Sequence, residues 1–331
     1  MLAEDSCQRS PRTTPGSFRP RFSRVGGVLS PQAKSPKSSP KPSAIGGHRS
    51  RDSGVCSRGP AFVPYHHHLM DVNGGDGEQG MDIDLNSDLG ESFGAYTIGA
   101  DEELFQIITS ANVACGFHGG DPRSIERAIL RAKELGVRVG AHPGYPDLVG
   151  FGRRVVQSSV EEVRTDTLYQ LSAVAGVARA NGVRLQHLKA HGALSNVAAH
   201  DAATAGAIIT AVHAFDPTLI VLANPGALQE AAEAADQPFA VEAFADRTYH
   251  ANGRLTARSR ADALITDPEA AAQRMLNLVQ TGTLPTVDGD ALSVPVRSIC
   301  VHSDTPGAVE IMRAVRRTLE GAGVTIAALD A

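Results

Sequence analysis

Apolar residues fall into seven short runs between residue 81 and the end of the chain. Each run is about five to eight residues long, which is the length of a buried β-strand. Between most runs the apolar positions recur at helical spacing, as in Ile125, Ile129 and Ala132. The pattern predicts strands over 82–89, 107–114, 137–141, 185–191, 219–223, 239–244 and 297–302.

The predicted helices carry clear start and stop signals. Asp121 is a suitable N-cap, Pro122 suits the first turn that follows it, and Gly136 is a suitable stop. The segment 159–162 reads Ser-Val-Glu-Glu, a capping box that predicts a helix to Ala180. Further helices are predicted after Asp267-Pro268 and Thr305-Pro306, and two alanine-rich helices flank the fifth strand. Strands that alternate with helices indicate an α/β protein with a parallel sheet, either open or closed into a barrel.

Polar residues gather where the predicted strands end. Every carboxyl end carries His, Asp, Asn, Lys or Arg, usually beside Gly or Pro, and the amino ends show no such pattern. Active sites of parallel α/β folds lie at the carboxyl ends of the strands, and only a closed barrel brings all seven ends to one cavity. We therefore expect a (β/α)7-type barrel that forms a single domain over residues 81–331.

Composition separates the first 80 residues from the rest. They contain 11 Lys and Arg against 6 Asp and Glu, with 12 Ser and 9 Pro, whereas residues 81–331 contain 20 Lys and Arg against 30 Asp and Glu. A Ser/Pro-rich segment with few apolar runs cannot bury enough surface to offset its chain entropy. We expect residues 1–80 to be a disordered basic tail whose removal leaves function intact.

The remaining composition points to a cytoplasmic protein. The four cysteines form no C-x-x-C pair and suit a reducing compartment, and no run of 18 apolar residues occurs. We expect neither a membrane nor a nucleic acid as a partner.

Period-two spacing places charged residues inside the barrel. Asp84, Asn86 and Asp88 share one face of the first strand, and Lys189 and His191 share one face of the fourth. Burying even a neutral polar group without a partner costs about 2–7 kcal/mol. Two interpretations remain open: a ligand-binding site, or an ion-pair network that satisfies itself.

Six motifs, in order along the chain, resemble those of the LamB/YcsF family, to which the A subunits of 5-oxoprolinases belong. They are DLNSDLGESFG, SANVACGFHGGDP, GAHPGYPDLVGFGRR, HLKAHGALSN, EAFADRTY and ICVHSDTPGAV. The resemblance covers residues 81–331. The chain departs from the usual family pattern at four positions, where cysteine, proline, tyrosine and glycine are common. These positions are Ser87, Ala190, Ser195 and Ser303.

The resemblance implies a (β/α)7-type barrel that takes part in the ATP-dependent opening of 5-oxo-L-proline to L-glutamate. It also implies that the chain acts together with subunits B and C of a 5-oxoprolinase. Because no G-x-x-x-x-G-K-[ST] motif occurs, we expect ATP to be a co-substrate bound with the partner subunits.

This chemistry suggests roles for residues in the motifs. A catalytic acid, base or nucleophile is expected among Asp84, His118, His142, His191 and Asp246. Cofactor-binding or oxyanion-binding amides are expected at Gly116, Gly119 and Gly120. Substrate binding is expected from Asn86, Asn112, Arg153, Arg154, Lys189, Arg247, His302 and Asp304.

Alternatives stay open at this level. Cys115 is either a nucleophile beside His118 or, as we expect, a buried inert thiol. We expect no tightly held metal, and the candidate ligands, should one be present, are Asp84, His142 and His191. A metal-dependent deacetylase-like hydrolase and a non-catalytic substrate-binding subunit are the two competing functions.

Overall fold

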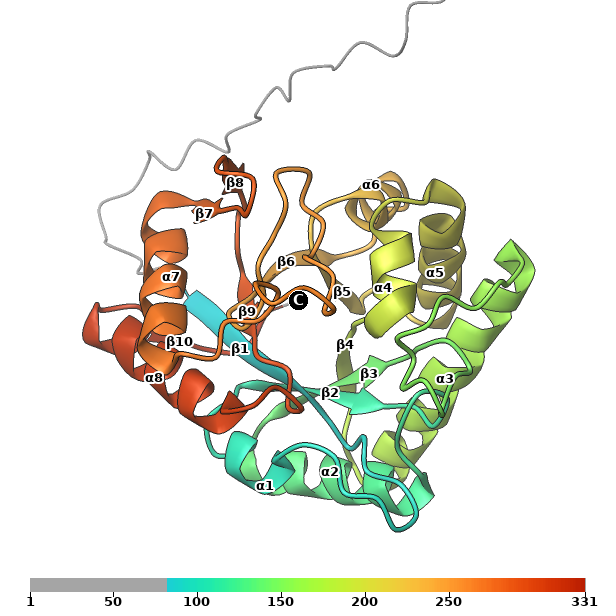
Figure 1. Ribbon diagram of the computed structural model, residues 1–331. Helices are drawn as coiled ribbons and strands as arrows, with labels where there is room; N and C mark the ends of the chain where they lie inside the picture. The colour runs from blue at the N-terminus through green and yellow to red at the C-terminus, as the bar shows by residue number, and fades with distance from the viewer. Residues whose placement is uncertain (1–81, 331) are drawn as a thin grey trace, which may run out of the picture. The chain divides into compact units, whose positions relative to one another are not determined.

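The structure, a computed structural model, describes residues 82–330, and seven of their strands close into a parallel barrel (Figure 1). Each strand pairs with the next in chain order, and the last pairs with both the sixth and the first. The barrel strands are β1 (Asp82–Leu89), β2 (Ser110–Ala114), β3 (Arg138–His142), β4 (Leu185–Leu188), β5 (Ile220–Ala223), β6 (Phe239–Phe244) and β9 (Ser298–Cys300). The predicted closed barrel is confirmed.

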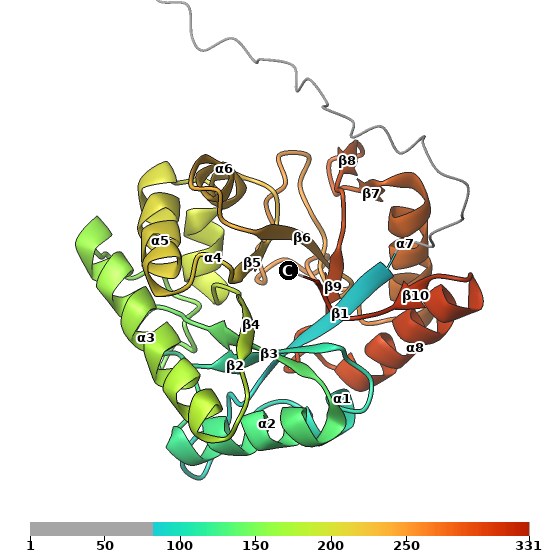
Figure 2. The same cartoon turned by 180° about the vertical axis from the view of Figure 1, so that it is seen from behind.

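Helices surround the ring of strands in both views (Figures 1 and 2). They are α1 (Asp101–Leu104), α2 (Pro122–Leu135), α3 (Val160–Ala180), α4 (Gly192–Ala198), α5 (Ala202–Phe215), α6 (Ala227–Ala234), α7 (Pro268–Thr281) and α8 (Ala308–Gly321). The predicted signals are in place: Asp121 caps α2, Ser159 and Glu162 form the capping box of α3, and Gly136 ends α2 in the left-handed conformation. Asp267 caps α7.

Some boundaries and elements differ from the prediction. The second strand begins at Ser110 rather than 107, because the preceding residues complete the turn after α1. The fourth ends at Leu188, because the following motif turns into α4, a short helix that the pattern does not predict. The α8 helix starts at Ala308, two residues after Pro306. An antiparallel pair, β7 (Thr283–Pro285) and β8 (Ala291–Ser293), and a short strand β10 (Thr325–Ile326) beside β1 were also not predicted.

The two faces of the barrel strands have opposite chemistry. Residues such as Leu85, Val113 and Ile299 belong to the apolar core, whereas the alternate positions on the same strands carry polar side chains. The interior is crowded enough to require a glycine: a Cβ on Gly140 would lie 2.2 Å from the ring of His187. The interior is thus a packed polar core.

The C-terminal segment packs at the amino ends of the strands. Leu329 clusters with Ile220, Leu222 and Ala240, and its carbonyl accepts a hydrogen bond from Gln186. The ends that carry the predicted functional residues lie at the opposite mouth of the barrel.

The predicted basic tail, residues 1–80, lies outside the described residues. Within residues 82–330, no helix combines the length and the apolar character needed to cross a membrane.

Candidate active site at the carboxyl ends of the strands

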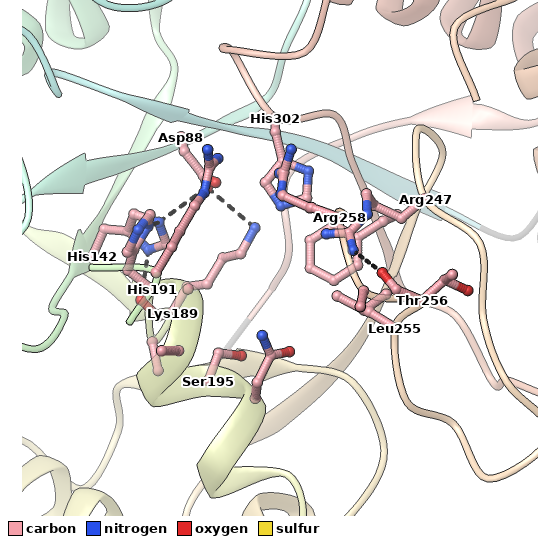
Figure 3. Close-up of a pocket in the computed structure, with 17 residues that line it drawn as sticks. Asp88, His142, Lys189, His191, Ser195, Arg247, Leu255, Thr256, Arg258 and His302 are labelled. Carbon is pink, nitrogen blue, oxygen red and sulfur yellow. Dashed lines mark hydrogen bonds and ion pairs between the residues drawn. The ribbon is translucent and has the colours of Figure 1, made fainter. Parts of the chain in front are cut away.

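A cavity of about 270 Å³ lies at the carboxyl ends of the barrel strands. Figure 3 shows its two walls, with Asp88, His142, Lys189 and His191 on one side and Arg247, Arg258 and His302 on the other. The α4 residue Ser195 also lines it, so strands, loops and one short helix all contribute. The remaining lining residues are Arg153, Ala190, Gly192, Ala193, Asn196, Phe244, Leu255, Thr256 and Ala257.

Asp84 does not line this cavity. Its carboxylate accepts hydrogen bonds from the hydroxyls of Thr109 and Ser110, both at 2.6 Å, and from Ser298. Burial raises the pKa of Asp84, although these hydroxyls oppose the effect. Its position near the start of β1 places it two layers below Asp88, which lines the cavity. Its contacts there are those of a satisfied interior group.

Asn86 and Asn112 form the next layer. Asn112 donates to the side-chain oxygen of Asn86 at 2.8 Å and to Asp88 at 2.9 Å, and its own oxygen lies 2.8 Å from His187 Nε2. Neither asparagine lines the cavity. Part of the polar interior is therefore a self-satisfied network, as one of the two interpretations anticipated.

Lys189 connects this network to the cavity. Its Nζ lies 3.2 Å from Asp88 Oδ1 and 2.9 Å from Glu242 Oε2, and it donates to Asn86. Burial by itself would lower the pKa of Lys189, but the carboxylates outweigh it and the pKa is raised. The same pairing, together with His142, holds the pKa of Asp88 well below its usual range despite its burial. Lys189 is fully engaged by the protein, so it is poorly suited to bind a substrate carboxylate.

Three of the predicted histidines meet at one wall of the cavity, where His142 and His191 line it and His118 does not. His142 Nε2 and His191 Nδ1 lie 3.1 Å apart, and the rings of His118 and His191 stack with their centroids 3.7 Å apart. Burial lowers the pKa of His118 and of His191, and the neighbouring histidines lower it further. The sequence correctly indicated that these three side chains converge.

Glu91 completes this group and was missed by the sequence analysis. Its Oε1 lies 3.3 Å from His118 Nε2 and 3.7 Å from His191 Nδ1. Burial raises the pKa of Glu91 well above its usual range, and the charge of Asp88 adds to the effect. Glu91 stands directly after the first strand, inside the first motif, and that position was the available signal.

His302 and Asp246 form a pair on the opposite wall. His302 Nδ1 lies 2.9 Å from Asp246 Oδ2, and the same carboxylate accepts a hydrogen bond from Thr305 Oγ1 at 2.6 Å. The His302 ring also stacks on Phe244, with centroids 4.7 Å apart. Asp246 is buried and its pKa is nonetheless lowered by His302. Among residues 82–330 the other ring nitrogen of His302 has no hydrogen-bond partner. This is the geometry of a histidine that a carboxylate orients toward a ligand.

The predicted arginines have different surroundings. Arg153 lines the cavity but is paired with Asp304 at 2.7 Å, so Asp304 binds an arginine rather than a ligand. Arg154 is two-thirds exposed, is bound to Asp147, and does not line the cavity. Arg247 lines it and donates to the carbonyl of Thr256 at 2.6 Å.

Arg258 lines the cavity and was not predicted. Among residues 82–330, none forms a hydrogen bond or ion pair with its guanidinium, and burial together with Arg153 lowers its pKa. Burial, then the charge of Arg258, lowers the pKa of Arg247 to about 10. Arg258 sits in a long loop after β6 that contains several arginines, and nothing in that spacing distinguishes it.

The glycines of the second motif do not line the cavity. The Gly116 amide donates to the Gly119 carbonyl and the Gly120 amide to the Glu91 carbonyl, both at 2.9 Å. Two of the three amides expected to bind a cofactor are therefore already satisfied. Cys115 is buried, which raises its pKa, as suits an inert thiol.

Three of the four departures from the family pattern lie at or beside the site, whereas Ser87 donates to the carbonyl of Val301 at 2.7 Å and does not line the cavity. Ala190 and Ser195 line the cavity, and Ser303 Oγ lies 3.4 Å from Glu91 Oε2. Smaller side chains at 190 and 195 leave more room in this cavity than proline and tyrosine would.

Comparisons with known proteins agree with this architecture. The chain is 51% identical to the A subunit of the 5-oxoprolinase of Symbiobacterium thermophilum, over 74% of this chain and 95% of that protein. It is 49% identical to the corresponding A subunit from Thermus thermophilus, over 75% of this chain and all of that protein. The crystal structure of a lactam utilization protein, also from Thermus thermophilus, superposes with a TM-score of 0.71 at 48% identity, covering 75% of this chain and 100% of that one. Residues 83–331 match the LamB/YcsF family, and the chain belongs to that family.

Proposed function

We propose that the chain is the A subunit of an ATP-dependent 5-oxoprolinase and opens the lactam ring of 5-oxo-L-proline to give L-glutamate. Relatives that are named as 5-oxoprolinase A subunits align with this chain over nearly their whole length, and about half of the aligned residues are identical. Their name supports a multisubunit enzyme, and subunits B and C are the proposed partners.

The observation that carries the proposal is the chemistry of the two cavity walls. Arg258, which has no anionic partner among the described residues, lies with Arg247 on one side, and the buried histidines lie on the other. A half-buried guanidinium without a counter-ion is a favourable site for a carboxylate, which it can bind in a bidentate fashion. A small lactam with one carboxylate presents the complementary pattern.

The His302–Asp246 pair is the best-placed proton carrier for the reaction. Ring opening needs a base to activate water and an acid to protonate the departing nitrogen. Because Asp246 engages Nδ1 of His302, the second ring nitrogen is free to hold or move a proton in the cavity. We therefore assign His302 the acid–base role and Asp246 the task of orienting it.

ATP supplies the driving force in this scheme. Amide resonance makes the lactam a weak electrophile, and phosphorylation of its oxygen is the simplest activation. Because the chain lacks a P-loop motif, we propose that the nucleotide binds together with the partner subunits.

A reconstituted assay tests the function. The full chain combined with subunits B and C should release glutamate and phosphate from 5-oxoproline only when ATP is present. A mixture that stays inert, or that is equally active without this chain, refutes the proposal. Release of glutamate without ATP would instead favour the competing function, a metal-dependent deacetylase-like hydrolase.

Variants in the same assay test the roles. His302→Gln should lower kcat by about 10²–10⁴-fold, the usual contribution of an acid–base group. Arg260→Gln, in the loop after β6 that also carries Arg258, is the matched control for substitutions of Arg258 and should leave activity unchanged, because Arg260 is exposed and paired with Asp262. A His302→Gln enzyme with a raised KM and an unchanged kcat would favour a subunit that only binds substrate.

A further inference from the structure

The histidine wall holds more hydrogen-bond acceptors than donors. His142 Nδ1 lies 2.7 Å from the carbonyl of Lys189, and His191 Nε2 lies 2.8 Å from the carbonyl of Phe151. A carbonyl only accepts hydrogen bonds, so both of these nitrogens must carry the hydrogen. In the neutral rings, His142 Nε2 and His191 Nδ1 are therefore lone pairs.

These two lone pairs point at each other. The two nitrogens are 3.1 Å apart, and Glu91 Oε1 lies 3.7 Å from His191 Nδ1. Glu91, His142 and His191 are all almost fully buried, so water cannot freely compensate for the missing donor. Asp88 Oδ1, 3.4 Å from His142 Nε2, adds a further acceptor to the group. An added cation, either a proton or a metal ion, would satisfy these atoms.

We propose that Glu91, His142 and His191 bind one divalent transition-metal ion, with zinc the best fit. A tetrahedral zinc ion with ligand bonds near 2.0–2.1 Å sets its ligand atoms about 3.3 Å apart. The observed distances of 3.1 and 3.7 Å bracket that value. One carboxylate and two imidazoles are also a ligand set that zinc uses in catalytic sites, with a fourth position left open.

The surroundings have the features that support metal ligands. Backbone carbonyls fix the tautomer of both histidines, as outer partners of liganding histidines usually do. Phe151 is held at a φ of 54°, which is uncommon for a residue other than glycine, and its carbonyl is the one that accepts from His191. A Cβ on the neighbouring Gly152 would lie 2.6 Å from the His191 ring. The loop is thus shaped closely around this side chain.

His118 orients the carboxylate in this arrangement. Its Nε2 lies 3.3 Å from Glu91 Oε1, its ring stacks on His191, and its Nδ1 is buried without a partner among the described residues. Asp88 is less suited to be a ligand, because its Oδ1 already accepts from Lys189 and Asn112. Of the ligands considered from the sequence, His142 and His191 are retained and Glu91 replaces Asp84.

A bound ion would polarise a carbonyl or lower the pKa of a water molecule, and either effect suits attack on an amide. The site assignment is nevertheless independent of the 5-oxoprolinase assignment. Metal uptake is measured without substrate, ATP or partner subunits, so either proposal can fail while the other stands.

Metal content of the purified full chain is the test. After incubation with zinc and removal of free metal, elemental analysis should find about one zinc per chain, and zinc should raise the thermal midpoint relative to a chelator-treated sample. His191→Gln and Glu91→Gln should each lower zinc affinity by at least tenfold. The chain also carries His66, His67 and His68, which can bind zinc by themselves. A triple His→Gln variant at those positions is the matched control and should keep the single bound zinc.

Cobalt substitution covers the case in which the site variants do not fold. The variant in which His66, His67 and His68 are replaced by glutamine, here called the triple-tail variant, should show the visible absorption of a four- or five-coordinate nitrogen–oxygen site when it is loaded with Co²⁺. Folded protein that takes up no zinc would overturn the proposal and favour a shared proton. Zinc uptake that survives both site substitutions, or that disappears in the triple-tail variant, would overturn it as well.

Discussion

Lys189→Met tests whether the charge network below the cavity holds the barrel together. The Lys189 ammonium is about 97% buried and lies within 3.2 Å of both Asp88 and Glu242. Methionine keeps much of the side-chain volume but leaves two buried carboxylates without their cation. Removing one partner of a buried ion pair costs about 3–5 kcal/mol, because the remaining charge is uncompensated.

The expected loss is large enough to measure directly. For a domain of this size each kcal/mol shifts the thermal midpoint by about 2–4 °C, so Lys189→Met should lower it by roughly 6–20 °C. Denaturant unfolding followed by circular dichroism measures the free-energy change. Glu242→Gln should lower the free energy of unfolding by less than Lys189→Met does, since Lys189 keeps its ion pair with Asp88. The double variant should lose less stability than the sum of the two single variants.

Lys133→Met is the control for this measurement. Lys133 is on the surface, where its ammonium donates to the carbonyl of Asn181, so its loss should cost well under about 1 kcal/mol. If Lys189→Met destabilises the protein no more than Lys133→Met does, the buried network is not a major source of stability.

Three further predictions concern substrate binding, packing and pH. Arg258→Ala should raise the KM for 5-oxoproline about ten- to a hundredfold in the reconstituted assay. The thermal midpoint should stay within about 2 °C, because the guanidinium has no hydrogen-bond or ion-pair partner among the described residues. An unchanged KM contradicts a role in carboxylate binding. Gly140→Ala should destabilise the barrel by about 3 kcal/mol or more in an unfolding experiment, because the added Cβ would overlap the ring of His187. Gly206→Ala in α5 is the control: its added Cβ meets no atom within 4 Å, so it should be neutral or stabilising. Burial raises the pKa of Asp101 from 3.8 to about 6, so the folded state favours the neutral acid and loses stability as the pH rises through 6. Asp101→Asn should therefore gain stability relative to the parent between about pH 4 and pH 7, by at most about 3 kcal/mol, and equal stability profiles in urea would contradict this.

Much of the barrel could be predicted from the amino-acid sequence alone. The predicted limits of β1 and β6 agree with the structure, and so do those of α3. These elements are specified by local physics: apolar runs bounded by polar ends, a capping box, and proline at a first turn. The short helix α4 escaped prediction, because its residues follow a strand without a break in the pattern.

The composition of the site depended on the tertiary structure. The two-residue period placed Asp84 and Asp88 correctly on one face, but it carries no information on depth, and only Asp88 reaches the cavity. Depth follows from strand register and closure of the barrel, which are set by pairing between distant segments. Glu91 and Arg258 reach the site through loops whose course is determined by packing against the rest of the fold. The sequence by itself thus determined the strands, the helices and the chemistry at their ends, whereas long-range contacts decided which of those side chains meet.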